Sequence, residues 1–350
     1  MKIALLSRGN TACGVSLHAE LIGREWIKMG HSLSVFAPNN IRPVKEDEDY
    51  VIRCYSDEGD HKKTFFHPES FLDTDYDILV AERVERVPLE PLREIFPEIR
   101  KKAKTVYVVH ERKLPTNPMF YDLEWDAIVC FDERYKRQLS NFEDKIHIIP
   151  YPAGYLRRGN KQEARKKLGL PPNAKIIFGY GWAPELHVFP ILPSLQELCK
   201  HLSFVYLVLA DPTTKEIEKL RNYEFMELRQ ELPPMDRIVT YLHASDIYLV
   251  HKQKKEVREG AAVVPSAILM CIGASTPIVT SDTEFVWFLD KEVIKYSNPA
   301  EFEREIAGIL TGEMDIGKTL KAASLRAARG TLATLVRVDE MPMRPYEEER

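Results

Sequence analysis

The sequence lacks the features of a membrane-spanning, secreted or nucleic-acid-binding protein. It has no run of about 18 consecutive apolar residues, so no membrane span is expected. The apolar stretch from Met1 to Ser7 is too short for a secretory signal, which favours a cytoplasmic location. The 49 basic and 53 acidic residues leave a net charge of −4, which argues against electrostatic binding of nucleic acid. Because hydrophobic residues make up 44% of the chain, globular cores are expected.

Paired cysteines are also missing. The five cysteines are odd in number, scattered, and never spaced as Cys-x-x-Cys. They are Cys13, Cys54, Cys130, Cys199 and Cys271. A disulfide framework or a zinc site is therefore not expected, and we predict buried free thiols instead.

The chain opens with an alternation of elements that is typical of a parallel sheet. Residues 3–7 predict a buried strand, residues 15–29 predict an apolar-periodic helix that Gly30 ends, and residues 32–36 predict a second strand. Such a strand–helix–strand unit pairs its strands in parallel, because sheet twist nearly fixes the handedness of the crossover.

The same alternation continues through both halves of the chain. Further strands are predicted at 77–81, 105–109, 126–131, 145–149, 176–180, 204–209, 246–250 and 277–280. Further helices are predicted at 89–102, 133–140, 162–168, 190–201, 213–228, 236–243, 299–310 and 316–335, whereas 44–68 reads as a loop or an irregular strand. At 350 residues the chain exceeds one typical core.

We therefore predict two tandem doubly wound Rossmann-like domains that face each other across a cleft. Their expected bounds are 1–152 and 153–335, with a tail at 336–350. In open parallel sheets, ligands bind beyond the carboxyl ends of the strands. Side chains that follow strands are therefore the candidates for function.

The stretch from Lys255 to Asp282 is the strongest candidate for an anion site. Pro265 and Ser266 predict the start of an apolar helix, and Gly273 predicts its end. Unpaired N–H groups of Ser266 and Ala267 at the positive end of the helix dipole would suit a phosphate. The alternative is a solvated loop leading into a core helix.

Cations upstream of this helix favour the phosphate interpretation. Lys252 and Arg258 lie in the loop before it, so we predict that both contact a phosphate. The alternative for both is exposure to solvent. Trp182 follows another strand and would stack on a sugar or base ring, or else cap the core.

Two strand ends in the first half carry polar pairs. His110 and Glu111 follow a strand that reads as central, so His110 is a candidate catalytic residue, although single histidines are often structural. Glu82 and Arg83 hold the equivalent place on the preceding strand and would bind an acceptor or form a salt bridge with each other.

The loop from Gly9 to Ser16 has the spacing of a phosphate loop but not its chemistry. Val15 stands where the lysine that reaches the phosphates would be, which disfavours an ATPase. No G-x-G-x-x-G occurs here, which disfavours a dehydrogenase. Gly14 either contacts a ligand or serves a turn, and either Gly9 or Gly14 would need positive φ for such a turn. No D-x-D follows a strand, so no metal is expected.

Several segments together resemble the retaining nucleotide-sugar glycosyltransferases of the two-Rossmann (GT-B) type, in particular glycosyltransferase family 4. The resemblance covers nearly the whole chain. Gly14-Val-Ser-Leu-His18 resembles the glycine turn into the first helix, and Lys28-Met-Gly-His-Ser-Leu-Ser-Val35 resembles "R-G-H-x-V-x-V". The other matching segments are Asp126–Glu133, Ile146–Tyr151, Ala244–Val250 and Gly273–Asp282, the last similar to "A-x-G-x-P-V-V-x-S-D". His110 matches the histidine of the family that contacts the donor sugar.

The chain departs from that family in its donor motifs. The two glutamates of the E-x7-E signature fall on Ala262 and Met270, and a register that starts at Glu259 leaves Ala267 in the second place. The Arg and Lys that hold the donor diphosphate are replaced by Trp182 and His187.

The resemblance implies sugar transfer from a nucleotide-diphosphate sugar to an acceptor, with retention and without a cofactor or metal. The acceptor would be a glycan, a lipid or a small molecule. The missing glutamates keep a catalytically inactive homologue open, and a nucleotide-sugar epimerase on the same two-domain plan is a further alternative.

Overall fold

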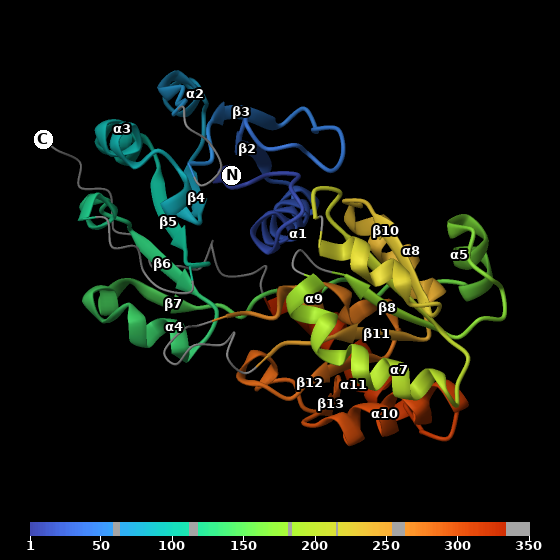
Figure 1. Cartoon of the computed structure of the whole chain (residues 1–350). Helices are drawn as coiled ribbons and strands as arrows, with labels where there is room; N and C mark the ends of the chain where they lie inside the picture. Colours follow the sequence, from blue (N-terminus) through green and yellow to red (C-terminus); the bar gives the residue numbers. More distant parts are fainter. Residues whose placement is uncertain (59–63, 112–117, 181–183, 215, 254–262, 334–350) are drawn as a thin grey trace, which may run out of the picture. The chain divides into compact units, whose positions relative to one another are not determined.

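A computed structural model describes residues 1–58, 64–111, 118–180, 184–214, 216–253 and 263–333 of the chain. Contacts divide it into two compact units, and the boundary in the chain lies between Pro152 and Ala153 (Figure 1). Each unit is built on one parallel sheet, as the sequence predicted. Within the described part of the chain, no helix is both long and apolar enough to cross a bilayer.

The sheet of the first unit has seven strands in the order β3-β2-β1-β4-β5-β6-β7, and every pairing is parallel. The strands are β1 (Lys2–Leu6), β2 (Ser32–Pro38), β3 (Val51–Tyr55), β4 (Ile78–Glu82), β5 (Lys104–Val108), β6 (Ala127–Cys130) and β7 (Ile146–Ile148). The chain runs outward from β1 to β3 and then returns to β4 on the other side of β1. The strand order therefore reverses between β1 and β4, and ligands bind beside such a reversal in open parallel sheets.

The helices of the first unit are α1 (Gly14–Lys28), α2 (Pro68–Asp73), α3 (Leu89–Lys102) and α4 (Glu133–Gln138). The thiol of Cys13 caps α1 by accepting a hydrogen bond from the Ser16 amide. Gly30 adopts φ +88° just after the helix, a conformation that a side chain would strain. Trp26 anchors the C-terminal half of α1 in the core with 4% exposure.

The sheet of the second unit has six parallel strands in the order β10-β9-β8-β11-β12-β13. They are β8 (Ile176–Tyr180), β9 (Val205–Ala210), β10 (Met226–Gln230), β11 (Ile247–Val250), β12 (Ile278–Ser281) and β13 (Ile294–Tyr296). The order reverses between β8 and β11, so this sheet has its own ligand-binding position there.

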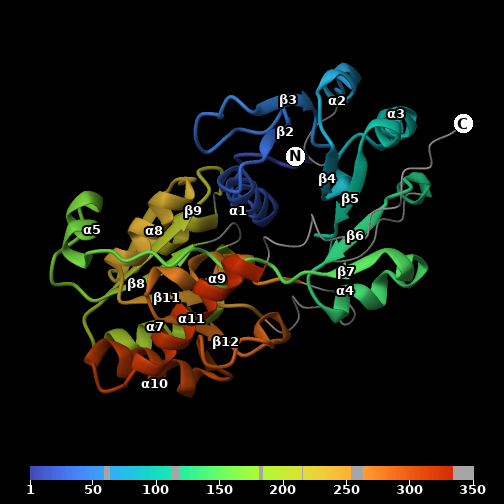
Figure 2. The same cartoon turned by 180° about the vertical axis from the view of Figure 1, so that it is seen from behind.

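The α-helices of this unit lie around its sheet. They are α5 (Lys161–Leu168), α6 (Pro184–His187), α7 (Leu192–Cys199), α8 (Met235–Ala244), α9 (Ser266–Cys271), α10 (Pro299–Thr311) and α11 (Gly317–Ala333). Helix α7 packs against α10, and α5 packs against α8 (Figures 1 and 2). Side chains of α7, α10 and the strands share one hydrophobic core, which includes Leu195, Tyr206 and Ile306.

The predicted helix at 213–228 is wrong. A 3-10 turn, η5 (Glu216–Asn222), is followed by strand β10. Ile217 and Leu220 do have helical spacing, but β10 is an edge strand whose five residues are all half-buried. An edge strand does not show the continuous apolar run of a central parallel strand, so its pattern was mistaken for a helix. The predicted helix at 190–201 is divided into η4 (Phe189–Ile191) and α7.

The connector after Pro152 packs directly on α9. The Gly154 amide donates to the carbonyl of Leu269 at 2.8 Å, and the Arg157 amide donates to the carbonyl of Gly273 at the same distance. A Cβ built on Gly154 would lie 2.0 Å from the carbonyl oxygen of Met270. Only glycine allows this approach, which fixes the C-terminal end of α9.

Replacing Gly154 with alanine should therefore destabilise the second unit by about 2 kcal/mol or more, because a backbone carbonyl would have to move. Gly308→Ala is a milder comparison, since its new Cβ would lie 3.3 Å from the Cβ of Met314, a contact that a shift of a few tenths of an ångström relieves. It should cost less than Gly154→Ala, because alanine also favours a helix. Urea unfolding of both variants measures the difference, and equal midpoints would refute the proposed close approach.

Candidate functional site

A buried polar cluster lies at the carboxyl ends of β1, β4 and β5. Glu82 ends β4 and is completely buried; its Oε2 accepts a hydrogen bond of 2.8 Å from Ser7. Its Oε1 is hydrogen-bonded to Nδ1 of His18 on α1 and lies 3.7 Å from Nε2 of His110. We call Ser7, His18, Glu82 and His110 the Glu82 cluster.

The charge of this cluster is set by burial and by the two imidazoles. Burial alone would raise the pKa of Glu82, but His18 and His110 outweigh it and lower that pKa to about 2. Burial lowers the pKa of His110 despite the nearby Glu82 carboxylate. At neutral pH Glu82 is therefore ionised, whereas His110 is neutral. A neutral imidazole donates a hydrogen bond from one ring nitrogen and accepts one at the other.

Aromatic rings complete the surroundings of the two histidines. The His18 and His110 ring centroids are 5.0 Å apart, and Phe131 and Tyr151 lie against both rings. The Tyr151 hydroxyl donates to the carbonyl of Gly14 at 2.7 Å, which ties the start of α1 to the segment after β7. The first turn of α1 is thereby fixed beside His110.

The backbone is strained at the same edge of the sheet. Arg83, directly after Glu82, adopts the left-handed conformation with φ +54°, and Asn10 after β1 has the same φ. Gly9 has φ +23°, whereas Gly14 begins α1 without positive φ. The turn at positive φ is thus at Gly9, the first of the two glycines considered from the sequence. Strained residues often cluster at functional sites, because the surrounding structure must hold them there.

Arg83 points from this strained position toward Glu85. Its Nε donates to Oε1 of Glu85 at 2.8 Å, and its side chain is 31% exposed. Glu111 lies buried nearby and accepts a hydrogen bond from the His110 amide at 2.9 Å. Burial and the neighbouring Glu85 raise the pKa of Glu111 well above the usual range. Among the described residues at this edge, Arg83 is a partly accessible cation, whereas Glu82 is enclosed.

Among the described residues, His18, Glu82 and His110 form a group whose side-chain atoms could ligate a metal ion. However, Nδ1 of His18 and Oε1 of Glu82 are hydrogen-bonded directly to each other, which leaves no space for a metal ion between these two atoms. The arrangement fits a hydrogen-bond network of Ser7, His18 and Glu82, beside which the His110 ring lies with its Nε2 3.7 Å from Glu82.

In the second unit, Lys252 follows β11 and reaches a histidine that follows β8. Its Nζ lies 3.0 Å from Nε2 of His187, and Nδ1 of His187 lies 2.8 Å from the carbonyl of His251. A carbonyl only accepts, so Nδ1 carries the hydrogen and Nε2 accepts from the lysine. The Lys252 amide and carbonyl are both bonded to the Ser281 hydroxyl on β12. The ammonium group therefore has a fixed place at the reversal of strand order.

Helix α9 begins at Ser266 as predicted, but the Ser266 amide differs from the prediction. The Ser266 amide is not unpaired, because it donates to the carbonyl of Val264 at 2.8 Å. Pro265 brings the chain into a tight turn before α9, and α9 is only six residues long. Ser266 and Ala267 are half-buried. Arg258 and Trp182 lie outside the described residues.

Three residues near the candidate sites were not predicted from the sequence. They are Ser7, His18 and His187, the last of which is the partner of Lys252. For His18 a signal exists: it falls on the buried face of α1 together with Val15, Ile22 and Trp26. A polar residue on an otherwise apolar face needs a buried partner. No pattern within the sequence indicates that the partner is Glu82, because the two are 64 residues apart.

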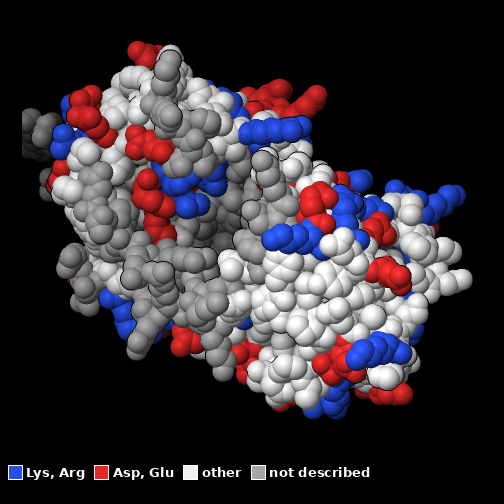
Figure 3. All heavy atoms as spheres, in the orientation of Figure 1, with Lys and Arg blue, Asp and Glu red and all other residues white. Residues whose placement is uncertain are grey.

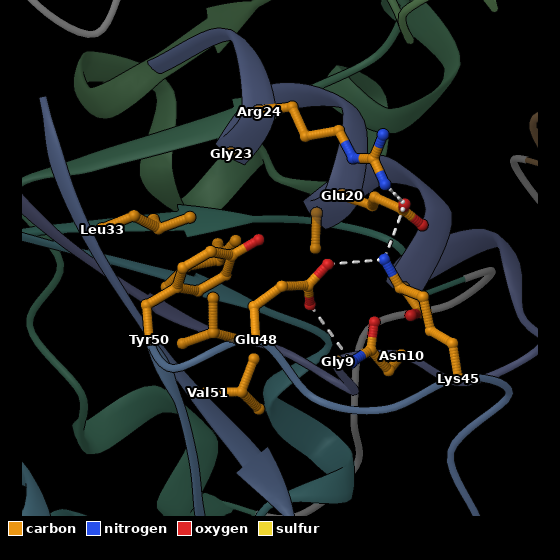
Figure 4. Close-up of a pocket in the computed structure, with 14 residues that line it drawn as sticks. Gly9, Asn10, Glu20, Gly23, Arg24, Leu33, Lys45, Glu48, Tyr50 and Val51 are labelled. Carbon is orange, nitrogen blue, oxygen red and sulfur yellow. Dashed lines mark hydrogen bonds and ion pairs between the residues drawn. The ribbon is translucent and has the colours of Figure 1, made fainter. Parts of the chain in front are cut away.

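A small pocket beside α1, β2 and β3 is unsuited to a sugar or nucleotide (Figure 4). Its volume is about 30 Å³, which holds roughly one water molecule. Lys45 bridges Glu20 and Glu48 at 3.2 and 2.7 Å, and Arg24 also pairs with Glu20. These ion pairs fix the loop between β2 and β3, so we assign the pocket a structural role.

Comparison with known proteins identifies the fold. No protein-family model matches the sequence. A glycosyltransferase from Rickettsia africae ESF-5 superposes with a TM-score of 0.63 and 14% identity over 94% of each chain. HepE of Anabaena, solved with UDP and glucose, gives 0.62 and 12% over 96% of each chain. An alpha-glucosyltransferase solved with UDP and a 13-mer DNA gives 0.64 and 10% over 96% of each. The chain has the GT-B fold, with two Rossmann-like sheets.

Replacing Glu82 with glutamine should destabilise the protein in a pH-dependent way. The pKa of Glu82 is depressed to about 2 in the folded protein, so its charge stabilises the fold above the unfolded pKa of 4.5. A depression of this size corresponds to about 3 kcal/mol at neutral pH, lost as the pH falls through the folded pKa.

Urea unfolding of wild type and Glu82→Gln between pH 7 and pH 3 tests this expectation. The difference in unfolding free energy should stay constant from pH 7 to about pH 5 and shrink below it, as the pH falls from the unfolded pKa of 4.5 toward the folded pKa of about 2. Glu98→Gln is the control, because Glu98 is an exposed residue on α3 paired only with Lys101 at 2.7 Å. A difference for Glu82→Gln that stays constant with pH would show that the charge of Glu82 is not the source of the stability.

Proposed function

We propose that this protein transfers a sugar from a nucleotide-diphosphate sugar to an acceptor, with retained anomeric configuration and without a metal ion. The observation that carries the proposal is the pair of Lys252 and His187 at 3.0 Å. His187 stands near the place where glycosyltransferase family 4, which the sequence resembles, carries the Arg and Lys that hold the donor diphosphate, and the Lys252 ammonium reaches His187 from β11. A cation at the reversal of strand order is suited to a donor diphosphate.

Lys252 would stabilise the leaving diphosphate, on which negative charge grows in the transition state. The neutral His187 holds the ammonium group without competing for charge. Arg258 and the Ala267 amide are proposed to make further contacts with the diphosphate, and Ser266 to contact it through its side chain. Trp182 is proposed to stack on a ring of the donor. The half-buried state of Ser266 and Ala267 is compatible with this role.

In the first unit, His110 is proposed as the catalytic residue that positions or polarises the donor sugar. Burial makes its imidazole neutral, so it can accept or donate a hydrogen bond to a sugar hydroxyl. Glu82 is proposed to act through His110 rather than to touch the acceptor, because it is enclosed by His18 and Ser7. The accessible Arg83 would contact the acceptor, and Gly14 would permit close approach of the backbone.

The acceptor is proposed to be a glycan, a lipid or a small molecule rather than a nucleic acid. Over the described residues of the face in Figure 3, acidic and basic side chains are interspersed. Together with a net charge of −4, this distribution does not favour counterion release from a phosphate backbone. The alpha-glucosyltransferase solved with DNA shows only that the fold itself is compatible with such a partner.

An inactive homologue that binds a nucleotide sugar or a protein partner is the second candidate. Met270 stands where the second glutamate of the family would be, and only 5% of it is exposed. A donor contact from that position is therefore missing. A nucleotide-sugar epimerase, the third candidate, would convert the donor without an acceptor.

Incubation with a panel of nucleotide sugars and acceptors tests the activity directly. We expect release of the nucleoside diphosphate together with a glycosylated product, and His110→Ala should lower the rate about 100-fold. The melting temperature should also fall, because the buried ring packs against Phe131 and Tyr151, so the rate is compared at a temperature where both proteins are folded. Epimerised donor in place of a glycosylated product would favour the epimerase. Binding without any turnover across the panel would favour the inactive homologue.

The phosphate role of Lys252 is tested by thermal shift. Ligand that binds only the folded protein raises its melting temperature, so the best nucleoside diphosphate should stabilise the wild type. Lys252→Met should weaken binding of that diphosphate at least about tenfold, because a charge-assisted contact is lost. Lys200→Met, at an exposed lysine paired with Glu197, is the matched control. Equal shifts in both variants would place the diphosphate elsewhere.

A further inference from the structure

The contact between Lys252 and His187 in the second unit combines a permanent charge with a side chain that titrates near neutral pH. Nζ of Lys252 lies 3.0 Å from Nε2 of His187, and Nδ1 of His187 lies 2.8 Å from the carbonyl of His251. Because that carbonyl only accepts, the ring hydrogen is on Nδ1, and the lone pair on Nε2 accepts from the ammonium group. This arrangement exists only while His187 is neutral.

The ammonium group opposes protonation of His187 in the ligand-free protein. A proton on Nε2 would remove the acceptor and would place two positive charges 3.0 Å apart. The backbone of Lys252 is held in place, since its amide and its carbonyl are both bonded to the Ser281 hydroxyl. Without a ligand, the neutral ring is therefore favoured.

An anion at Lys252 reverses this preference. Lys252 lines a pocket of about 310 Å³ at the carboxyl ends of β11, β12 and β13. Both Lys252 and His187 are half-buried rather than enclosed. A diphosphate that reaches the ammonium group through this pocket brings negative charge close to the ring. Opposite charges within about 4–6 Å favour the protonated form of a histidine.

Other titratable groups line the same pocket. Asp282 lies 3.5 Å from Lys295, so these two charges offset each other. Nδ1 of His251 lies 2.7 Å from the Tyr296 hydroxyl, and burial raises the pKa of Tyr296 above its usual range. Tyr296 therefore stays neutral near neutral pH, whereas His251 is a second histidine whose titration has to be separated from that of His187.

The charges of the neighbouring turn η5 are at the surface. This turn packs against α6, the helix that ends at His187. Glu218 and Lys219 of the turn are exposed, and Glu218 pairs with Arg221 at 2.7 Å. Exposed charges are screened by salt and contribute little. Lys252, by contrast, contacts the His187 ring directly.

We propose that His187 is a proton-linked positioning residue: as a neutral ring it holds Lys252 in the free protein, and it takes up one proton from solvent when a nucleotide-diphosphate sugar binds at Lys252. The inference rests on the proposed function and deepens it, because it makes the affinity for the donor depend on pH. A lysine or an arginine in place of His187 would keep its charge between about pH 6 and pH 9, so this dependence would be absent.

Calorimetric titration of the full chain with UDP-glucose and GDP-mannose at pH 6 and pH 8.5 tests the linkage. Nucleotide sugars are suitable probes, because their phosphates lack the second acidic group that titrates near pH 6 in a terminal phosphate. We expect the wild type to bind the better probe about tenfold more tightly at pH 6. It should also take up as much as one proton on binding, which is measured by repeating the titration in buffers of different ionisation enthalpy.

Three variants separate His187 from the other histidines. His187→Gln keeps an acceptor for Lys252 but cannot be protonated, so its affinity should be the same at both pH values and its proton uptake should vanish. His251→Gln should keep both effects. His201→Gln makes the same change at an exposed histidine of the same unit and is the matched control.

NMR of the histidine rings in the ligand-free protein gives a readout that does not depend on binding. His187 should carry its hydrogen on Nδ1 and should titrate at a lower pH in the wild type than in Lys252→Met, because the variant lacks the neighbouring charge. Equal titration in the two proteins would overturn the inference. A pH dependence of binding that is absent from the wild type, persists in His187→Gln, or is lost in His251→Gln would also overturn it.

The outcomes separate this inference from the proposed function. A donor that binds through Lys252 and is transferred, with the same pH dependence in the wild type and in His187→Gln, would reject the inference and leave the function standing. Proton-linked binding without transfer to any acceptor would support the inference and reject the transferase. A wild type that binds no nucleotide sugar at either pH would reject both.

Discussion

Every strand pairing in the two sheets is parallel, and this constraint decides where polar chemistry is found in the molecule. Parallel strands end at the same edge, so residues far apart in the sequence come together there without any local motif. Ser7, Glu82 and His110 meet at one such edge, and His251, Ser281 and Tyr296 meet at the other. The first group lies where strand order reverses, and the second extends from β11, next to the reversal, to the edge strand β13.

The buried carboxylate of Glu82 shows how such an edge becomes a defined site. An ionised group without exposure to water must be surrounded by donors, and Ser7 and His18 are placed to donate. The His110 ring lies 3.7 Å from the same carboxylate and is packed against His18, Phe131 and Tyr151. The neutral form of His110 follows from its burial, so the cluster combines one fixed charge with one adaptable ring.

The central strands and the long helices could be predicted from sequence, whereas the edge strands could not. β1, β4 and β5 are continuous apolar runs, but β3, β10 and β13 lie at or next to solvent and lack that pattern. Within the candidate site, His110 could be found because it follows a central strand. The contact between His18 and Glu82 beside it could not be found, since it joins α1 to β4 and the two residues are 64 positions apart.

The packing of α9 and the place of Lys252 both depend on contacts between segments that are far apart in the sequence. The connector backbone at Gly154 lies so close to the carbonyl oxygen of Met270 that only glycine fits there, which ties the connector to the C-terminal end of α9. The Lys252 side chain, which follows β11, extends to His187, which comes after β8. In a parallel sheet, neighbouring strands end at the same edge, so the place of a cation in space does not require that one particular strand supply it.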